Sequence, residues 1–108
     1  MEWQIDYFGQ VVQDAILTFP PGIQARFVHL TERMSVFGPD LGMPHTRALS
    51  DGLFELRIQG EEGIARVFYC TLSGKRIVML HGFVKKSQKT PPNELKIARD
   101  RLAKVKKP

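Results

Sequence analysis

Cysteine and long apolar runs are scarce in this 108-residue chain. Its one cysteine, Cys70, cannot form an internal disulfide and stands in an apolar strand pattern, where a buried free thiol is common. The longest apolar run, Ile77 to Leu80, is far shorter than a membrane span. The N-terminus carries Glu2 and Asp6 where a signal peptide would be basic. These absences predict a soluble cytoplasmic protein without a membrane partner or a disulfide framework.

The motifs of several common enzyme classes are also missing. The three histidines lie in separate predicted elements, and no cysteine or carboxylate shares a metal-ligand spacing with them, so we predict no metal site. The glycine-flanked connector at 60–63 is acidic and too short to cradle phosphates. No Gly-x-Ser-x-Gly or Cys–His pattern indicates acyl transfer. We therefore expect no cofactor.

Positive charge is present in excess but is unevenly distributed. The net charge is +5; residues 81–108 hold nine Lys or Arg against two Asp or Glu, whereas residues 1–60 hold four against seven. A mildly acidic body thus carries a basic C-terminal quarter, as expected when electrostatics act on one face. Nucleic acid is the favoured anion, and its phosphates would make binding salt-dependent. A solvated lysine-rich helix with a frayed tail is the alternative.

The hydrophobic content of 43% is enough for a single modest core, and we expect one domain over residues 1–108. Periodicity predicts an α+β order of strand, two helices, three strands and a helix. The expected elements are a strand at 3–8, helices at 10–19 and 23–37, a loop at 40–51, strands at 53–59, 64–72 and 75–83, and a final helix with Asn93 as its N-cap. The two helices form a hairpin that covers one face of a small, mostly antiparallel sheet, with Arg26, Glu32 and Arg33 pointing outward.

Two arginines are predicted to lie side by side in this sheet. If the hairpin closes near Gly60 to Gly63, Arg57 and Arg66 are neighbours across the strand pair and share a face. Glu55 is the only acidic residue of the first of these strands, and it is predicted to lie on the same face as Arg57. Because like charges repel, each guanidinium needs a carboxylate or a phosphate as partner.

Two lysines extend this cationic set. Lys85 and Lys86 leave the third strand of the predicted meander, so they are placed to converge on the surface that carries the arginines. Four cations from three strands favour a phosphate-binding cleft. The alternative is two exposed arginines that pair with Glu55, Glu61 or Glu62.

Three segments of the chain together resemble a known family. They are Leu53-Phe54-Glu55-Leu56-Arg57, then Arg66-Val67-Phe68-Tyr69, and then the run from Leu80 to Pro91, in which Lys85-Lys86 precedes Lys89-Thr90-Pro91. In this order they resemble the phage-associated, HigB-like branch of the RelE/ParE toxin superfamily. The resemblance covers nearly the whole chain, and its lysine pair followed by Lys-Thr-Pro is the most specific motif. It implies a RelE-like β-α-α-β-β-β-α fold with a basic C-terminal helix.

The resemblance also implies the toxin of a type II toxin–antitoxin pair. In the RelE and HigB lineages, the toxin is a metal-independent endoribonuclease that cleaves messenger RNA in the ribosomal decoding site. The ribose 2′-hydroxyl attacks the neighbouring phosphorus, which leaves a cyclic phosphate and a free 5′-hydroxyl. The implied partners are an antitoxin with a helix-turn-helix domain, the ribosome and messenger RNA.

The implied chemistry assigns roles to individual residues. It needs a base near the 2′-hydroxyl, cations for the phosphate and a donor for the leaving oxygen. Arg66 matches the strand arginine of the family and is assigned to the phosphate together with Arg57. A lysine clustered with arginines has its pKa lowered by like charge, so Lys85 or Lys86 is the candidate base or acid.

The sequence departs from RelE at two places. RelE carries lysines in the second strand where this chain has Glu55, and a tyrosine at the start of its last helix where this chain has Thr90-Pro91-Pro92. His81 is more often a packed, hydrogen-bonded histidine, but it and Tyr69 remain catalytic candidates. Further candidates for RNA binding are Lys75, Arg76, Phe83 and Lys89.

Two other functions remain open at this point. A ParE-like member of the superfamily would use the same fold to inhibit DNA gyrase, without a nuclease cleft. A degenerate member would bind RNA or the ribosome without catalysis.

Overall fold

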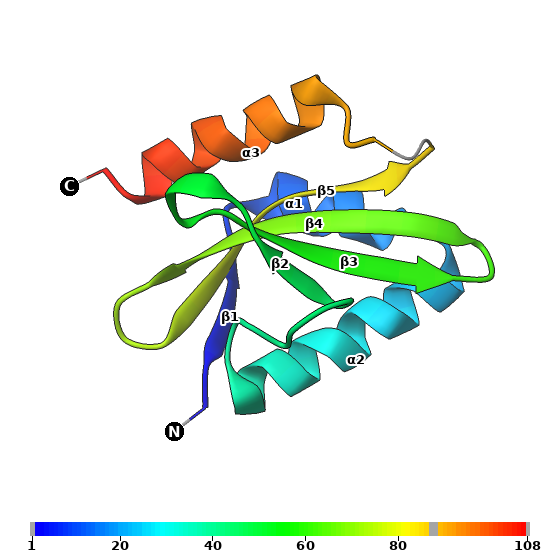
Figure 1. The fold of residues 1–108 in the computed structure, drawn as a ribbon, viewed down its shortest axis with the longest axis horizontal. Coiled ribbons are helices and arrows are strands. Elements are labelled where there is room, and N and C mark those ends of the chain that lie inside the picture. The colour runs from blue at the N-terminus through cyan, green and yellow to red at the C-terminus, as the bar shows by residue number, and fades with distance from the viewer. Residues whose placement is uncertain (1, 87–88, 108) are drawn as a thin grey trace.

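The computed structural model describes residues 2–86 and 89–107. Five strands form a mixed sheet in the order β1-β5-β4-β3-β2, with helices on both faces (Figure 1). The elements are β1 (Gln4–Tyr7), α1 (Gln10–Leu17), α2 (Pro21–Phe37), β2 (Thr46–Ala48), the 3-10 helix η1 (Ser50–Gly52), β3 (Phe54–Gly60), β4 (Gly63–Leu72), β5 (Arg76–Lys85) and α3 (Pro92–Val105). Strand β1 is parallel to β5, and the other neighbours are antiparallel. The α+β class and the mostly antiparallel sheet are confirmed.

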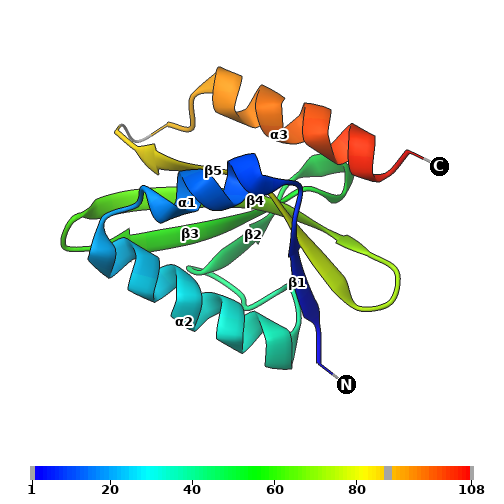
Figure 2. The same cartoon turned by 180° about the vertical axis from the view of Figure 1, so that it is seen from behind.

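Helices α1 and α2 form the predicted hairpin on one face of the sheet (Figure 2). Proline is tolerated at the first position of a helix because the missing N–H would have no helical partner there, and α2 begins at Pro21. The helix ends at Gly38, whose φ of 99° favours glycine. The apolar stripe of α2, including Ile23, Phe27 and Met34, is buried against the sheet. This face holds the larger of two hydrophobic clusters.

Helix α3 covers the opposite face of the sheet. Its apolar stripe packs as predicted, with Ala98 and Leu102 buried and Leu95 and Val105 partly buried in the second hydrophobic cluster. The predicted N-cap at Asn93 is wrong, since the helix begins one residue earlier at Pro92, whose fixed φ suits a first helical position. None of the helices in the described part of the chain is long and apolar enough to cross a membrane.

The segment predicted as a loop at 40–51 contains ordered structure. Strand β2 pairs with the first half of β3 at the sheet edge, and η1 follows it. Thr46 is buried, and its hydroxyl donates to Asp40 and accepts from the Leu41 amide, which fixes the entry to the strand. Three residues are too few to show alternation, so composition alone indicated a loop. The predicted element order is therefore corrected by one short strand before β3.

The β3–β4 hairpin closes as the sequence predicts. Gly60 pairs with Gly63 across a two-residue turn, and the register then sets Arg57 opposite Arg66. Register in a hairpin follows from turn length, and side chains alternate with a period of two. The two arginines therefore share the face of the sheet that α3 covers.

Strand β5 contains a β-bulge at Leu80. His81 pairs with Phe68 and Met79 pairs with Tyr69, so Leu80 has no partner of its own on β4. A bulge of this kind lets two consecutive side chains occupy the same face. Leu80 is buried in the cluster under α3, and His81 also contacts that helix through Glu94. The bulge thus marks where β5 meets α3.

Candidate functional site

A cationic cleft is lined by residues of β2, β3, β4 and β5 and of the segment leading into α3. Its volume is about 340 Å³, within the range of small-ligand sites. Five cationic side chains surround it against one carboxylate. The lining residues are Arg47, Leu49, Glu55, Arg57, Arg66, Phe68, Lys85, Lys89, Thr90 and Leu95. We call this the α3 cleft; it lies between the sheet and the C-terminal helix and contains Arg57, Arg66 and Lys85, three of the four cations predicted to form a phosphate-binding cleft.

The centre of the α3 cleft is a carboxylate between two guanidiniums. Glu55 Oε1 lies 3.8 Å from Arg57 Nε, and Glu55 Oε2 lies 3.8 Å from Arg66 Nε. Glu55 and Arg66 are buried, at 6% and 5% exposure, whereas the Arg57 side chain is 31% exposed. The alternative prediction was two exposed arginines that pair with glutamates. It holds in part, because Glu55 pairs with both arginines but Arg66 is not exposed. One carboxylate leaves the arginine pair with a net positive charge.

Both arginines keep a buried N–H donor without a hydrogen-bond partner. The Nε atoms of Arg57 and Arg66 are the two such side-chain atoms in the described part of the chain. Burial lowers the pKa of Arg66, with the Glu55 charge opposing this effect and Arg57 adding to it. Arginine begins from so high a pKa that it stays protonated. An unpaired buried donor is costly, so the arginine pair is held in the fold at an energetic penalty.

Of the two predicted lysines, the structure brings one into the cleft. Lys85 lines it, and its pKa is lowered by desolvation first, then by the charges of Arg66 and Arg57, with Glu55 opposing them. Lys86 follows the end of β5 and is exposed. Ser87 and Gln88, which belong to the same predicted cationic segment, lie outside the described residues.

His81 faces α3 but is held by two partners. Its Nε2 is 2.8 Å from Glu94 Oε1, and its Nδ1 is 3.5 Å from Arg101 Nη1. Its ring also stacks on Phe83, with the centroids 5.9 Å apart. Of the two readings of the sequence, these contacts match the packed, hydrogen-bonded histidine.

Tyr69 and Phe83 are core residues by position. Tyr69 is fully buried on the opposite face of the sheet, where its hydroxyl donates to the Pro39 carbonyl at 2.5 Å and its ring stacks on Phe54. Burial raises the pKa of Tyr69. Phe83 is 8% exposed and stacks on Phe68 beneath the α3 cleft. Neither ring is exposed for stacking on an RNA base.

The remaining RNA-binding candidates separate along β5. Lys89 lines the α3 cleft. Lys75 and Arg76 lie at the opposite end of the strand, where Arg76 Nε donates to Asp6 Oδ2 at 2.8 Å. A ten-residue strand is about 30 Å long, so these two cations lie far from the cleft.

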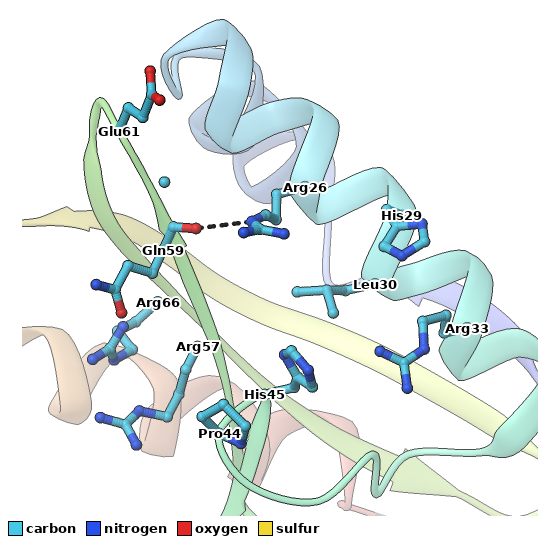
Figure 3. Close-up of a pocket in the computed structure, with 11 residues that line it drawn as sticks. Arg26, His29, Leu30, Arg33, Pro44, His45, Arg57, Gln59, Glu61 and Arg66 are labelled. Atoms are coloured by element: carbon cyan, nitrogen blue, oxygen red, sulfur yellow. Dashed lines mark hydrogen bonds between the residues drawn. The ribbon is translucent and has the colours of Figure 1, made fainter.

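Several cationic residues that line cavities were not predicted from the sequence. Arg47 of β2 lines the α3 cleft, but its strand was predicted as loop. A second cavity, of about 640 Å³, lies beyond the edge of β3 (Figure 3). Arg26 and Arg33, which were expected to point outward, line it together with His29. Their i, i+3, i+7 spacing on one helix face was a usable signal.

In residues 2–86 and 89–107, no three His, Cys, Asp or Glu side chains gather as a metal ion would require.

The fold is similar to that of a protein solved in a RelE–RelB complex. A chain in the crystal structure of an archaeal RelE–RelB complex from Pyrococcus horikoshii OT3 is similar to this one with a TM-score of 0.59. The two are 18% identical, and the match covers 78% of this chain and 96% of that one. At this identity the likeness concerns the fold. No curated protein matches the sequence.

The match of the sequence to a family model shows which family the chain belongs to. The family model described as "Phage derived protein Gp49-like (DUF891)" matches residues 14–103. The chain therefore belongs to the Gp49-like family of phage-derived proteins. The matched span includes every residue that lines the α3 cleft.

Proposed function

We propose that this protein is the toxin of a type II toxin–antitoxin pair, of the HigB-like branch, and that it cleaves messenger RNA on the ribosome. The observation that carries the proposal is the pair of buried, unpartnered guanidinium donors in a cleft ringed by five cations. The RelE-like fold and the phage-derived family support the toxin assignment. The ligand class is a phosphodiester, since guanidinium forks match phosphate oxygens.

In the proposed reaction, the ribose 2′-oxygen forms a bond to phosphorus and the bond to the 5′-oxygen breaks. The 2′-hydroxyl proton passes to a base, and the 5′-oxygen gains a proton as it leaves. Arg66 and Arg57 hold the non-bridging oxygens, where negative charge grows in the transition state. Glu55 keeps the two guanidiniums close together before the RNA arrives.

Lys85 is the proposed base in this scheme. Its ammonium lies among like charges in a partly desolvated cleft, so its pKa is lower than that of an ordinary lysine. More of it is therefore neutral, and able to accept a proton, near neutral pH. Lys86 and Lys89 contribute positive charge beside it.

The pH dependence of cleavage tests the role of Lys85. Because only the neutral amine accepts a proton, the single-turnover rate should rise about tenfold per pH unit below the Lys85 pKa and level off above it. Lys85→Arg stays protonated and should remain slow across the range. Lys86→Arg is the matched control and should keep the wild-type profile. A Lys85→Arg profile parallel to the wild type would remove Lys85 from the base role.

The proposed protein partner is an antitoxin with a helix-turn-helix domain. The similar archaeal chain was solved in a RelE–RelB complex, which supports a protein partner; the helix-turn-helix domain is proposed from the sequence resemblance alone. We propose that the antitoxin acts by covering the α3 cleft or by blocking access to the ribosome.

Brief induction of the chain followed by mapping of transcript ends tests the proposed function. We expect rapid arrest of translation and new 5′-hydroxyl ends within coding frames. Co-expression of the neighbouring antitoxin gene should prevent both.

Other outcomes would overturn the proposal in favour of a named alternative. Intact transcripts with a DNA damage response would indicate a gyrase inhibitor. Unaffected growth with retained ribosome binding would indicate a module that binds without cleaving.

A further inference from the structure

The second cavity is also cationic, although it lies on the other side of β3. Four arginines and two histidines line it, against one carboxylate. The ionisable lining residues are Arg26, His29, Arg33, His45, Arg57, Glu61 and Arg66. Figure 3 shows Arg26 and Arg33 on α2 facing the edge of the sheet, with His45 between Arg33 and the strand. We call this the α2 cavity.

Helix α2 presents these cations because of their spacing. Arg26, His29 and Arg33 recur at i, i+3 and i+7, so they form one stripe beside the buried stripe of Ile23, Phe27, Leu30 and Met34. Arg26 Nε donates to the Gln59 carbonyl at 2.8 Å, which ties the helix to β3. Within the described ranges, Arg33 makes no hydrogen bond or ion pair, although it is only partly exposed. Its charge is therefore available to a ligand.

The α2 cavity and the α3 cleft share two side chains. Arg57 and Arg66 line both, and these are the arginines whose buried Nε donors lack a partner. The two cavities are thus joined at the arginine pair, and positive charge continues from the start of α3, past the pair, to α2. A ligand with negative charge at regular intervals matches this path better than a single small anion does.

The strand edge in the α2 cavity is already occupied by the chain itself. The Arg57 amide donates to the His45 carbonyl at 2.8 Å, and the Gln59 carbonyl accepts from Arg26. A protein strand that extends the sheet needs those backbone groups. The edge therefore offers side-chain cations rather than a backbone ladder, which favours a polynucleotide over an added peptide strand.

We propose that the α2 cavity binds the phosphates of the RNA segment next to the scissile phosphate. The strand then runs from the α3 cleft over Arg57 and Arg66 to Arg33 and Arg26. This inference rests on the proposed function, which places the scissile phosphate in the α3 cleft. It adds a binding site for the flanking nucleotides.

Binding of non-cleavable RNA of two lengths tests the inference. The probes are 2′-O-methyl oligonucleotides of about three and about twelve nucleotides. Their binding to the purified protein is measured by fluorescence anisotropy over a series of salt concentrations. Arg33→Ala should weaken binding of the longer RNA about tenfold, because it removes one charged hydrogen bond. It should also reduce the slope of log affinity against log salt concentration by about 0.7, because one phosphate contact is lost. Binding of the three-nucleotide RNA should not change. Lys104→Ala removes the same charge from an exposed site outside both cavities and should leave both RNAs near wild type.

The outcomes separate this inference from the proposed function. Length-dependent binding through Arg33, without transcript cleavage in cells, would support the α2 cavity and overturn the nuclease. Transcript cleavage with Arg33→Ala equal to Lys104→Ala would overturn the α2 cavity alone. If Arg33→Ala no longer binds an acidic peptide but binds RNA as the wild type does, the proposed RNA site is overturned in favour of a protein ligand. No binding of either RNA by the wild type would also overturn it.

Discussion

Replacing Arg66 with alanine is expected to reduce messenger RNA cleavage by about two to three orders of magnitude, the cost of losing one preorganised donor to transition-state charge. Arg66 is buried, and its Nε donor has no partner other than the Glu55 carboxylate 3.8 Å away. A rigid donor in a desolvated site interacts strongly with a phosphate oxygen because little water screens it. Quantified transcript ends after induction, and toxicity titrated against expression level, measure the effect.

Two further variants make the Arg66 experiment specific. Arg66→Lys keeps the charge but loses the planar fork, so it should recover only a small part of the activity. Arg76→Ala removes an arginine at the far end of β5, where it pairs with Asp6, and should cleave normally. Thermal unfolding must show that Arg66→Ala is folded at the assay temperature. Wild-type cleavage by folded Arg66→Ala would contradict the assignment.

Replacing Glu55 with glutamine is expected to destabilise the protein by about 3 kcal/mol in phosphate-free buffer. The glutamine has the same shape, but it leaves two neighbouring guanidiniums without the carboxylate between them. The estimate is at the low end for a broken buried ion pair because the Arg57 side chain is 31% exposed and water screens part of its charge. Urea unfolding measures the loss directly.

Added phosphate should restore much of the stability lost in Glu55→Gln. An anion that binds only the folded state stabilises it by mass action, and the variant has one more unbalanced charge to attract it. The midpoint of unfolding should therefore rise more with inorganic phosphate in the variant than in the wild type. Glu32→Gln, on the exposed side of α2, changes the net charge equally and should show neither effect. A Glu55→Gln protein as stable as the wild type, with no added response to phosphate, would show that the arginines do not form an anion site.

The arginine pair was predictable because strand geometry is local. A two-residue turn and a side-chain period of two are sufficient to set Arg57 beside Arg66 and to put Glu55 on the same face. The burial of Arg66 was not predictable, since it depends on Phe83 and on the segment before α3, which are distant in sequence. Arg47 was missed for a related reason, because its strand exists only through pairing with β3.

Residues of β5 were harder to assign to a face. Both faces of the sheet are covered by helices, so the strand reads as an unbroken apolar run and its pattern does not identify which side a residue occupies. Phe83 was therefore expected at an RNA surface, although it packs on Phe68. Lys75 and Arg76 were predicted to bind RNA together with Lys89, but they stand at the end of β5 opposite to the α3 cleft.

The bulge at Leu80 determines which side of the sheet receives Lys85. Up to Met79 the odd-numbered residues of β5 face the helical hairpin, whereas beyond Leu80 the odd-numbered His81, Phe83 and Lys85 face α3. Without the bulge, strict alternation through the same residues would turn Val84, instead of Lys85, toward the arginine pair. A change that removes the bulge but keeps every charged residue would therefore take the lysine out of the cleft. The break in the alternation of this strand, and not only its composition, determines that Lys85 lines the cleft.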